Sequence, residues 1–193
     1  MTTMRLRWAA AAAGLAGLLA AGLAACGGPA PVSSAPSDSN PIGDIPDSQA
    51  FVTYSGLPGF TIKVPEGWAT TTDADGSTVL TDKLNSIRLR ESHTATAPNE
   101  DSARTDLADL KTHAHGFAGG AVSTVSRPAG PVILTTYRSD APADPVTGKI
   151  INDDVERYQF FHQGLLVTVT LAGPHGADNV DPWRIVTDSV AFT

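Results

Sequence analysis

The sequence contains a single cysteine, Cys26, among its 193 residues. One cysteine excludes an internal disulfide, so the core must be held by packing. Basic residues are also scarce, with 13 Lys and Arg against 20 Asp and Glu, and the formal net charge is −7. Nucleic-acid binding needs a Lys/Arg patch that displaces phosphate counterions, so we expect no nucleic-acid partner.

Motifs that reveal catalysis or cofactor binding through their spacing are missing as well. The sequence has no Gly-x-Ser-x-Gly elbow, no phosphate-binding loop and no dinucleotide-binding glycine pattern. It also lacks the EF-hand pattern of alternating oxygen ligands with a glycine at the sixth position. We therefore expect no catalytic residue, no metal site and no cofactor, and we expect that the protein is not an enzyme.

The longest apolar run stands at the N-terminus, from Trp8 to Leu23, and follows the cationic residues Arg5 and Arg7. The run has the length of a signal-peptide core and is too short for an ordinary membrane-spanning helix. It closes on Leu23-Ala24-Ala25-Cys26, in which an aliphatic residue and two small residues precede the cysteine. This ending resembles the lipobox of bacterial lipoprotein precursors.

The lipobox resemblance implies that Cys26 carries diacylglycerol, that the chain is cut just before it, and that the new amino terminus is acylated, for example with palmitate. One acyl chain binds a membrane only marginally, whereas two or three hold it stably, at about 0.8 kcal/mol for each buried CH₂. We therefore expect residues 1–25 to be a signal peptide and the mature protein to sit on the extracytoplasmic face of the cell membrane. The alternative is a retained anchor helix with an incidental Cys26.

Residues 26–50 are expected to form the lipidated cysteine and a disordered tether. The stretch from Gly27 to Ser48 is rich in Gly, Pro, Ser and Asp and has hardly any large apolar residue. Such a stretch cannot bury enough surface to offset the entropy of ordering. Cleavage before Cys26 would remove two basic residues and no acidic one, leaving a charge of −9. An anionic membrane does not attract such a domain, so the lipid must anchor it.

Residues 51–193 are expected to form a single globular domain. Phe60–Val64 and Ile87–Glu91 alternate apolar and polar residues, as half-buried strands do, and this alternation turns Arg88 and Arg90 toward water. Asp75-Gly76 favours a two-residue hairpin turn with positive φ angles. Further strands are expected at residues 51–54, 77–81, 121–125, 131–138, 154–162, 164–172 and 190–192.

Two helices are expected between and after these strands. Asn99 is a candidate N-cap, an apolar stripe at helical spacing runs from Ala103 to Phe117, and Gly119-Gly120 is expected to end the helix. The second helix is expected to begin after Asn179 or Asp181. Together these elements predict an α+β fold, a mainly antiparallel β-sheet with helices packed on it.

The stretch Phe60-Thr-Ile-Lys-Val-Pro-Glu-Gly-Trp68 resembles the opening of PsbP-like domains, in which a strand runs into a Pro-x-Gly-Trp turn. The later order of strands and the closing Ser189-Val-Ala-Phe192 are similar too. Over residues 51–193, and with its lipobox, the chain also resembles the actinobacterial LpqN-type lipoproteins. The resemblance implies a PsbP-like fold and a binding or assembly role, linked in LpqN-type members to envelope glycolipids. It transfers no functional residue, because the matching positions are turn and core residues.

Aromatic side chains are the candidates for an apolar ligand pocket between the sheet and the helices. Ordinary core packing explains the same residues. The five candidates are Trp68, Phe117, Tyr158, Phe160 and Trp183.

Two sets of polar residues are candidates for metal sites. His113 and His115 fall at a helix end about 200° apart, which does not suit a shared metal, and Asp109 is placed to pair with His113. Several acidic residues before and at the start of the predicted strand 154–162 are candidates for calcium, although a solvated edge explains them better. They are Asp144, Asp153, Asp154 and Glu156.

These observations predict a non-catalytic, lipid-anchored domain of the cell envelope. It would either bind an acylated envelope lipid or glycolipid, or dock on a membrane protein assembly, with the tether raising its effective concentration. One alternative is an envelope-polymer hydrolase with a carboxylate pair, for example Glu91 with Asp154, which needs carboxylates about 5 to 9 Å apart in a pocket. The other is a purely structural surface protein, which would have no pocket.

Overall fold

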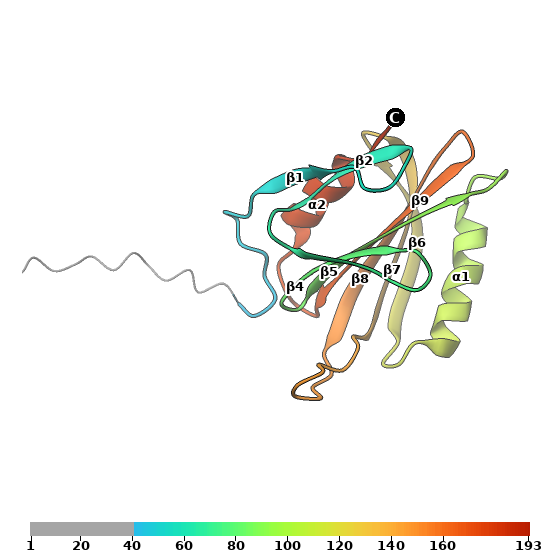
Figure 1. Cartoon of the computed structure of the whole chain (residues 1–193). Helices are drawn as coiled ribbons and strands as arrows, with labels where there is room; N and C mark the ends of the chain where they lie inside the picture. Colours follow the sequence, from blue (N-terminus) through green and yellow to red (C-terminus); the bar gives the residue numbers. More distant parts are fainter. Residues whose placement is uncertain (1–40) are drawn as a thin grey trace, which may run out of the picture. The chain divides into compact units, whose positions relative to one another are not determined.

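The computed structural model describes residues 41–193 of the chain (Figure 1). The predicted signal peptide, Leu23, Ala24, Ala25 and Cys26 lie outside the described residues, as does most of the predicted tether. The described part contains ten strands and two helices. They are β1 (Phe51–Tyr54), β2 (Phe60–Pro65), β3 (Ala69–Thr72), β4 (Thr78–Asp82), β5 (Asn85–His93), α1 (Glu100–His113), β6 (Ala118–Arg127), β7 (Gly130–Asp140), β8 (Asn152–His162), β9 (Leu165–Pro174), α2 (Val180–Asp188) and β10 (Ala191–Phe192).

Seven strands form the main sheet, in the order β3-β4-β5-β9-β8-β7-β6, and a second sheet has the order β1-β2-β10. Neighbouring strands run antiparallel in both sheets. The predicted class, an α+β fold dominated by antiparallel sheet, is therefore confirmed. The return of Val190–Phe192 to a sheet is also confirmed, and the sheet that β10 joins is the small one, where Phe192 pairs with Phe60.

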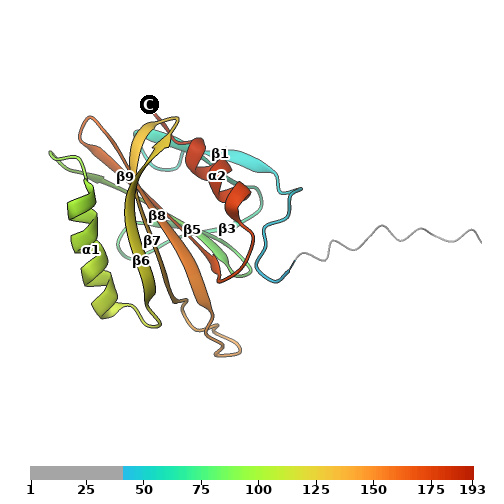
Figure 2. The same cartoon turned by 180° about the vertical axis from the view of Figure 1, so that it is seen from behind.

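The two helices lie on opposite sides of the seven-stranded sheet in both views (Figures 1 and 2). The face on the side of α2 and the small sheet, here called the core face, carries Leu89, Val169 and Tyr158 side by side on β5, β9 and β8. The opposite, outer face carries Arg88, Thr170 and Arg157 at the next register position. Helix α1 packs on β6 and β7 at one edge of the sheet.

The core forms where the alternating strands turn their apolar residues inward. Ile87 and Leu89, predicted to point inward, are completely buried, as are Val167 and Val169 of β9. The small sheet contributes Ile62 through the same alternation. Burying a side chain of this kind stabilises the fold by roughly 1.5 to 3 kcal/mol, so these strands supply much of the favourable free energy of folding.

Helix α1 begins as predicted and ends earlier than predicted. Oδ1 of Asn99 accepts a hydrogen bond from the Ser102 N–H at 2.9 Å, and Ser102 Oγ accepts one from the Asn99 N–H at 3.1 Å, which makes a capping box. The helix stops at His113, and Gly119-Gly120 lies inside β6, at a register shift between Ala118 and Ala121. Both glycines have positive φ, which suits a bulge as well as a helix end.

The β3–β4 hairpin turn also differs in detail from the prediction. Gly76 has a φ of +80°, but Asp75 is not among the residues with positive φ. The turn closes through the Gly76 N–H, which donates to the Asp73 carbonyl at 2.9 Å. The connection is longer than two residues, so only the glycine needs the left-handed conformation.

The folded domain begins before the predicted boundary at residue 51. Ile45 is buried, and its N–H donates to Oδ1 of Asn179 at 2.7 Å. The carbonyl of Gly43 accepts hydrogen bonds from Asn85 and Asn179 at 2.8 and 3.0 Å. Residues 43–45 are therefore part of the domain rather than of the predicted disordered tether.

The residue before α2 is Asn179, one of the two predicted caps, but its side chain makes no capping hydrogen bond to the helix. It binds the segment 43–45 instead. Within residues 41–193, neither helix is long and apolar enough to span a bilayer.

Candidate functional site

The core face changes from apolar to polar along two neighbouring strands, β7 and β8. Leu134 lies opposite Tyr158, the next inward pair is Thr136 opposite Glu156, and the following one is Arg138 opposite Asp154. Opposite charges directly across an antiparallel pair attract each other. The polar end of this face is the floor of a cavity of about 380 Å³.

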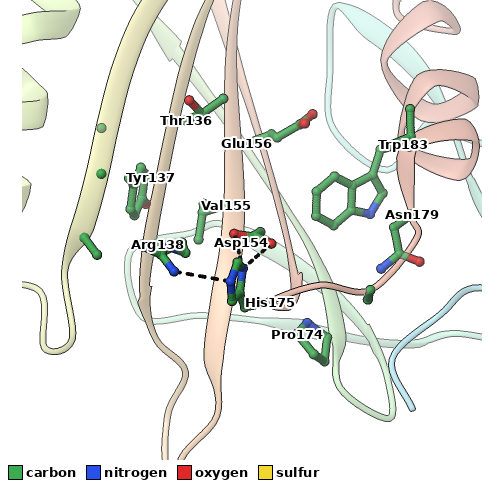
Figure 3. A pocket seen from close by; sticks show the side chains of 15 residues that line it. Thr136, Tyr137, Arg138, Asp154, Val155, Glu156, Pro174, His175, Asn179 and Trp183 are labelled. Carbon is green, nitrogen blue, oxygen red and sulfur yellow. Dashed lines mark hydrogen bonds and ion pairs between the residues drawn. The ribbon is translucent and has the colours of Figure 1, made fainter. Parts of the chain in front are cut away.

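The walls of this cavity, here called the core-face pocket, come from three other segments (Figure 3). Residues 174–179 bring His175 over the floor, and α2 contributes Val180 and Trp183. Gly119 and Gly120 of β6 form the far wall, and a Cβ at Gly119 would meet no atom within 4 Å. The pocket therefore has a charged floor and a partly apolar rim.

His175 joins Asp154 and Arg138 into one hydrogen-bonded chain (Figure 3). Its Nδ1 lies 2.9 and 3.0 Å from the two carboxylate oxygens of Asp154, and its Nε2 lies 3.3 Å from Nη1 of Arg138. Because a guanidinium can only donate, the tautomer that fits both contacts has Nε2 accepting from Arg138 and Nδ1–H donating to Asp154. The Gly176 N–H also donates to Asp154, at 3.2 Å.

A second chain of hydrogen bonds holds Glu156 in place. The Tyr158 hydroxyl donates to Glu156 Oε2 at 2.7 Å and accepts from Nη2 of Arg127 at 3.0 Å. Burial, with the hydrogen bond to Glu156, raises the pKa of Tyr158 well above its usual value, so the hydroxyl remains a donor. Arg127 also donates to Thr187 Oγ1 at 3.1 Å, which connects the sheet to α2.

The arrangement supports binding better than nucleophilic catalysis. Both nitrogens of His175 are engaged by Asp154 and Arg138, so His175 is not hydrogen-bonded to a hydroxyl or thiol that it could activate. Among residues 41–193, no three His, Cys, Asp or Glu side chains gather in a way that could hold a metal ion. What the pocket offers a ligand is a set of positioned hydrogen-bonding groups.

The predicted aromatic residues do not line one common pocket. Trp68, Tyr158 and Phe160 are packed in the hydrophobic core together with Trp183, and only Trp183 reaches the core-face pocket. Phe117 stacks on Tyr137, at 5.8 Å between ring centroids, and Tyr137 points to the outer face. Phe117 does not line the core-face pocket, so the structure does not bring it together with Trp183 there.

The other candidates are also separated by the fold. Glu91 lies level with Phe160 in the register and therefore about 20 Å along the strands from Asp154, too far for a catalytic pair. Asp153 points to the outer face, whereas Asp154 and Glu156 point to the core face, so these acids do not share a ligand. Asp144 accepts hydrogen bonds from its own loop.

The two histidines near the end of α1 lie apart as well. His113 is the last residue of the helix and His115 lies beyond it. Nδ1 of His113 lies 3.6 Å from Asp109 Oδ1, the predicted pairing, and 2.9 Å from the Asp109 carbonyl. His113 thus interacts with the end of its own helix.

Arg138 and His175 were not predicted as site residues. They could have been recognised from the apolar–polar alternation of the strands, which assigns Arg138, Asp154 and Glu156 to the inward face. An unpaired charge on a buried face destabilises the fold, so charged residues at such positions are expected to have partners. The partner His175 lies in a loop, and only the pairing of β8 with β9 brings it to Asp154.

Comparisons with solved structures identify the fold. Cyanobacterial PsbP (CyanoP) from Synechocystis sp. PCC 6803 superposes with a TM-score of 0.53 at 13% identity, over 85% of this chain and 100% of that one. The fold is PsbP-like. The sequence itself matches no family model and no curated protein.

Two further structures are similar at lower scores. LpqN of Mycobacterium tuberculosis, described as involved in cell envelope biogenesis, has a TM-score of 0.44 at 15% identity, over 76% of this chain and 92% of LpqN. A protein from Bacteroides thetaiotaomicron VPI-5482 has a TM-score of 0.48 at 12% identity, over 69% of this chain. The match spans 45% of the Bacteroides chain, less than half of its length. The PsbP-like fold is thus established, and the LpqN-type assignment stays a prediction.

Proposed function

We propose that the protein is an LpqN-type lipoprotein of the cell envelope, anchored by acylated Cys26, whose PsbP-like domain binds an acylated envelope lipid or glycolipid without chemically changing it. The polar head of the ligand occupies the core-face pocket. The anchor part rests on the lipobox pattern, and the binding part rests on the pocket.

The single observation that carries the binding proposal is the composition of the core-face pocket. Its volume of about 380 Å³ lies in the range of small-molecule sites, which combine apolar walls with a few placed polar groups. Arg138, Asp154 and Glu156 supply donors and acceptors for hydroxyl or phosphate groups. Val180, which is 70% exposed at the rim, provides an apolar surface for the part of the ligand nearer its acyl chains.

The charged floor makes this a site for a head group rather than for acyl chains. An apolar chain would gain little from displacing water at Arg138 and Asp154, because these groups would lose hydrogen bonds to solvent. A defined pocket also favours a small ligand over docking on a membrane protein assembly. A purely structural surface protein would not need such a cavity.

The anchor is tested by metabolic labelling with a radioactive fatty acid in the native host. We expect label on the wild-type chain and none on Cys26→Ala. Ser39→Ala, a change in the same predicted tether, is the matched control and should keep the label. Label on Cys26→Ala, or a mature N-terminus upstream of residue 26, would contradict the lipoprotein assignment.

The ligand is tested by native mass spectrometry of the full chain purified from its host. We expect a co-purifying mass that fragments as an acylated lipid. Ala177→Phe places a ring at the lining of the pocket and should remove that mass, whereas Ala74→Phe, at the exposed β3–β4 turn, should retain it. No lipid mass on the wild type, or the same mass on Ala177→Phe, would overturn the binding proposal.

One observation favours a second candidate, an envelope-polymer hydrolase. Asp154 and Glu156 are two residues apart on one face of β8, with Cα atoms about 6.6 Å apart, which allows their carboxyl groups to reach the separation of about 5 to 9 Å used by glycosidases. Release of reducing ends from purified peptidoglycan, abolished by both Asp154→Asn and Glu156→Gln, would establish this activity and displace the binding proposal. We expect no release, because Asp154 and Glu156 are already held by His175 and Tyr158.

A further inference from the structure

The outer face of the main sheet carries a cluster of three arginines on β5 and β8, the two neighbours of β9. Arg88 of β5 and Arg157 of β8 both pair with Thr170 of β9, so the three residues form one row across the sheet. With strands about 4.8 Å apart, the Cα atoms of Arg88 and Arg157 are about 10 Å apart. Arg90 and Thr168 occupy the next row on the same face.

This cluster, here called the arginine cluster (Arg88, Arg90 and Arg157), lies in an acidic domain. Residues 41–193 contain 11 basic and 19 acidic residues, so three of the few cations are collected on one patch. Helix α1 packs on β6 and β7, toward the other edge of the outer face, and leaves this patch accessible. Like charges placed this close together repel one another, so negatively charged groups nearby are expected to balance them.

Two carboxylates face the cluster, both from the turn between β3 and β4. Arg88 binds Asp73 through Nη1 and Asp75 through Nη2, the latter at 2.9 Å. Arg90 lies 3.9 Å from Asp75. Hydrogen bonds from the Ser77 backbone and from Arg88 lower the pKa of Asp75 to about 2, so both carboxylate and guanidinium are charged at neutral pH.

Arg157 has no such partner within the described residues. It forms no ion pair there, and its buried Nε has no hydrogen-bond acceptor. A buried donor without an acceptor costs about 1 to 3 kcal/mol, more when it is charged. The cluster therefore has three guanidinium groups against two carboxylates, and Arg157 is the one left unbalanced.

The cluster surrounds a hollow of about 200 Å³ whose polar lining consists of groups that donate hydrogen bonds. Guanidinium groups can only donate, and threonine and tyrosine hydroxyls can donate as well. Burial raises the pKa of Tyr137, so its hydroxyl stays protonated. No carboxylate lines the hollow, which is formed by Arg88, Arg90, Tyr137, Arg157, Thr168 and Thr170.

We propose that the arginine cluster is a binding site for a phosphate group, on the face of the sheet opposite the core-face pocket. The hollow is smaller than the range of small-molecule pockets, which begins at about 300 Å³, and this suits a compact oxyanion. Arginine recognises phosphate through paired N–H donors of a planar fork. The anion balances Arg157 and competes with Asp73 and Asp75 for Arg88 and Arg90.

The test is isothermal titration calorimetry of the full chain in neutral detergent at low ionic strength, with inorganic phosphate as the first probe. We expect saturable one-site binding and no such binding of chloride. Arg157→Gln should weaken phosphate binding at least tenfold. Arg184→Gln removes an exposed arginine from α2, where it pairs with Asp181, and should leave the affinity unchanged.

Two further variants separate recognition of the anion from general effects on folding. Asp75→Asn removes the competing carboxylate and should tighten phosphate binding severalfold, a gain that a merely structural role would not produce. Thr170→Val removes one donor without a change of charge and should weaken binding severalfold. No saturable binding to the wild type, or equal affinity in wild type and Arg157→Gln, would overturn the proposal.

A second probe identifies the source of the phosphate group. Glycerophosphoglycerol, the deacylated head group of phosphatidylglycerol, carries a phosphodiester with one negative charge. Comparable or tighter binding than inorganic phosphate would support an anionic lipid head group as the ligand. Binding of inorganic phosphate alone would support a free phosphate. Binding of neither probe would contradict the site.

Discussion

The side-chain amide of Asn179 donates a hydrogen bond to Oδ1 of Asn85 at 2.9 Å, in the interior of the domain. Asn179 is 2% exposed and Asn85 is 5% exposed. Because both amides also donate to the carbonyl of Gly43, this pair joins the entry segment, β5 and the start of α2. A satisfied buried network of this kind specifies one arrangement, and its loss is costly.

We expect Asn179→Ala to lower the free energy of unfolding by about 2 to 4 kcal/mol. The substitution leaves the Ile45 N–H without its acceptor and removes two donors from Gly43 and Asn85, and unsatisfied buried groups cost about 1 to 3 kcal/mol each. Urea unfolding followed by circular dichroism measures the change. A loss below about 0.5 kcal/mol would show that the network contributes little.

An Asn→Ala substitution at the surface should lower the free energy of unfolding by less. Asn99→Ala removes the exposed cap of α1, with its bond to the Ser102 N–H, and should cost about 1 kcal/mol. Ser102→Ala, which removes the reciprocal bond, should cost no more. The same urea experiment checks both. If Asn99→Ala lowered the free energy of unfolding more than Asn179→Ala, the burial of the asparagine would not be what determines the cost of replacing it.

Stability should depend on pH through Asp153. Its side chain is 7% exposed and its Oδ1 has no hydrogen-bond partner within the described residues. Burial, and secondarily the charge of Asp154, raises the pKa of Asp153 from 3.8 to about 6. The folded state thus binds a proton more tightly than the unfolded state, so this carboxyl makes the domain less stable as pH rises from about 4 to 6.

Asp153→Asn should remove this loss. At pH 7 the variant should be more stable than wild type by up to about 3 kcal/mol, and at pH 4 it should have no advantage. Asp47→Asn changes an exposed carboxylate and should give no comparable difference between the two pH values. Urea unfolding at pH 4 and 7 measures the free energy of unfolding of each variant and of the wild type. An equal effect of Asp153→Asn at both pH values would mean that its ionisation is not the cause.

Gly173 is required because its neighbours leave no room for a side chain. A Cβ at this position would collide with Oδ1 of Asn85 and come within 2.9 Å of Nδ2 of Asn179. Gly173→Ala should therefore destabilise the domain by about 1 to 3 kcal/mol. Asn85→Ala removes the colliding atom, so the double variant should lose less than the sum of the single changes. Additive losses in the double-mutant cycle would contradict the collision.

The strands could be predicted from the sequence because their pattern is local. Phe60–Val64 and Ile87–Glu91 alternate, and the structure buries the residues that the alternation turns inward. Asn99 could be recognised as a cap because its partner is three residues away. Gly119-Gly120 was misread because a positive φ serves a helix end and a β-bulge equally, and only the partner strand distinguishes them.

The candidate site could not be predicted from the sequence, because it depends on register. Arg138 meets Asp154 through the pairing of β7 with β8, and His175 meets Asp154 through the pairing of β8 with β9. The sequence does not give these registers. The placement of Phe117 on the outer face is a similar case, because the position of α1 on β6 and β7 is set by tertiary packing.

The point at which the chain enters the domain limits where the core-face pocket can act. Gly43 packs so closely on Pro174, a lining residue of the pocket, that a Cβ there would lie 2.6 Å from its ring. With Cys26 acylated as proposed, about 17 residues join the lipid to this point, a path of at most about 60 Å. The pocket would then stay close to the bilayer while the anchored molecule diffuses along it, and moving a ligand farther from the membrane would require its transfer to another carrier.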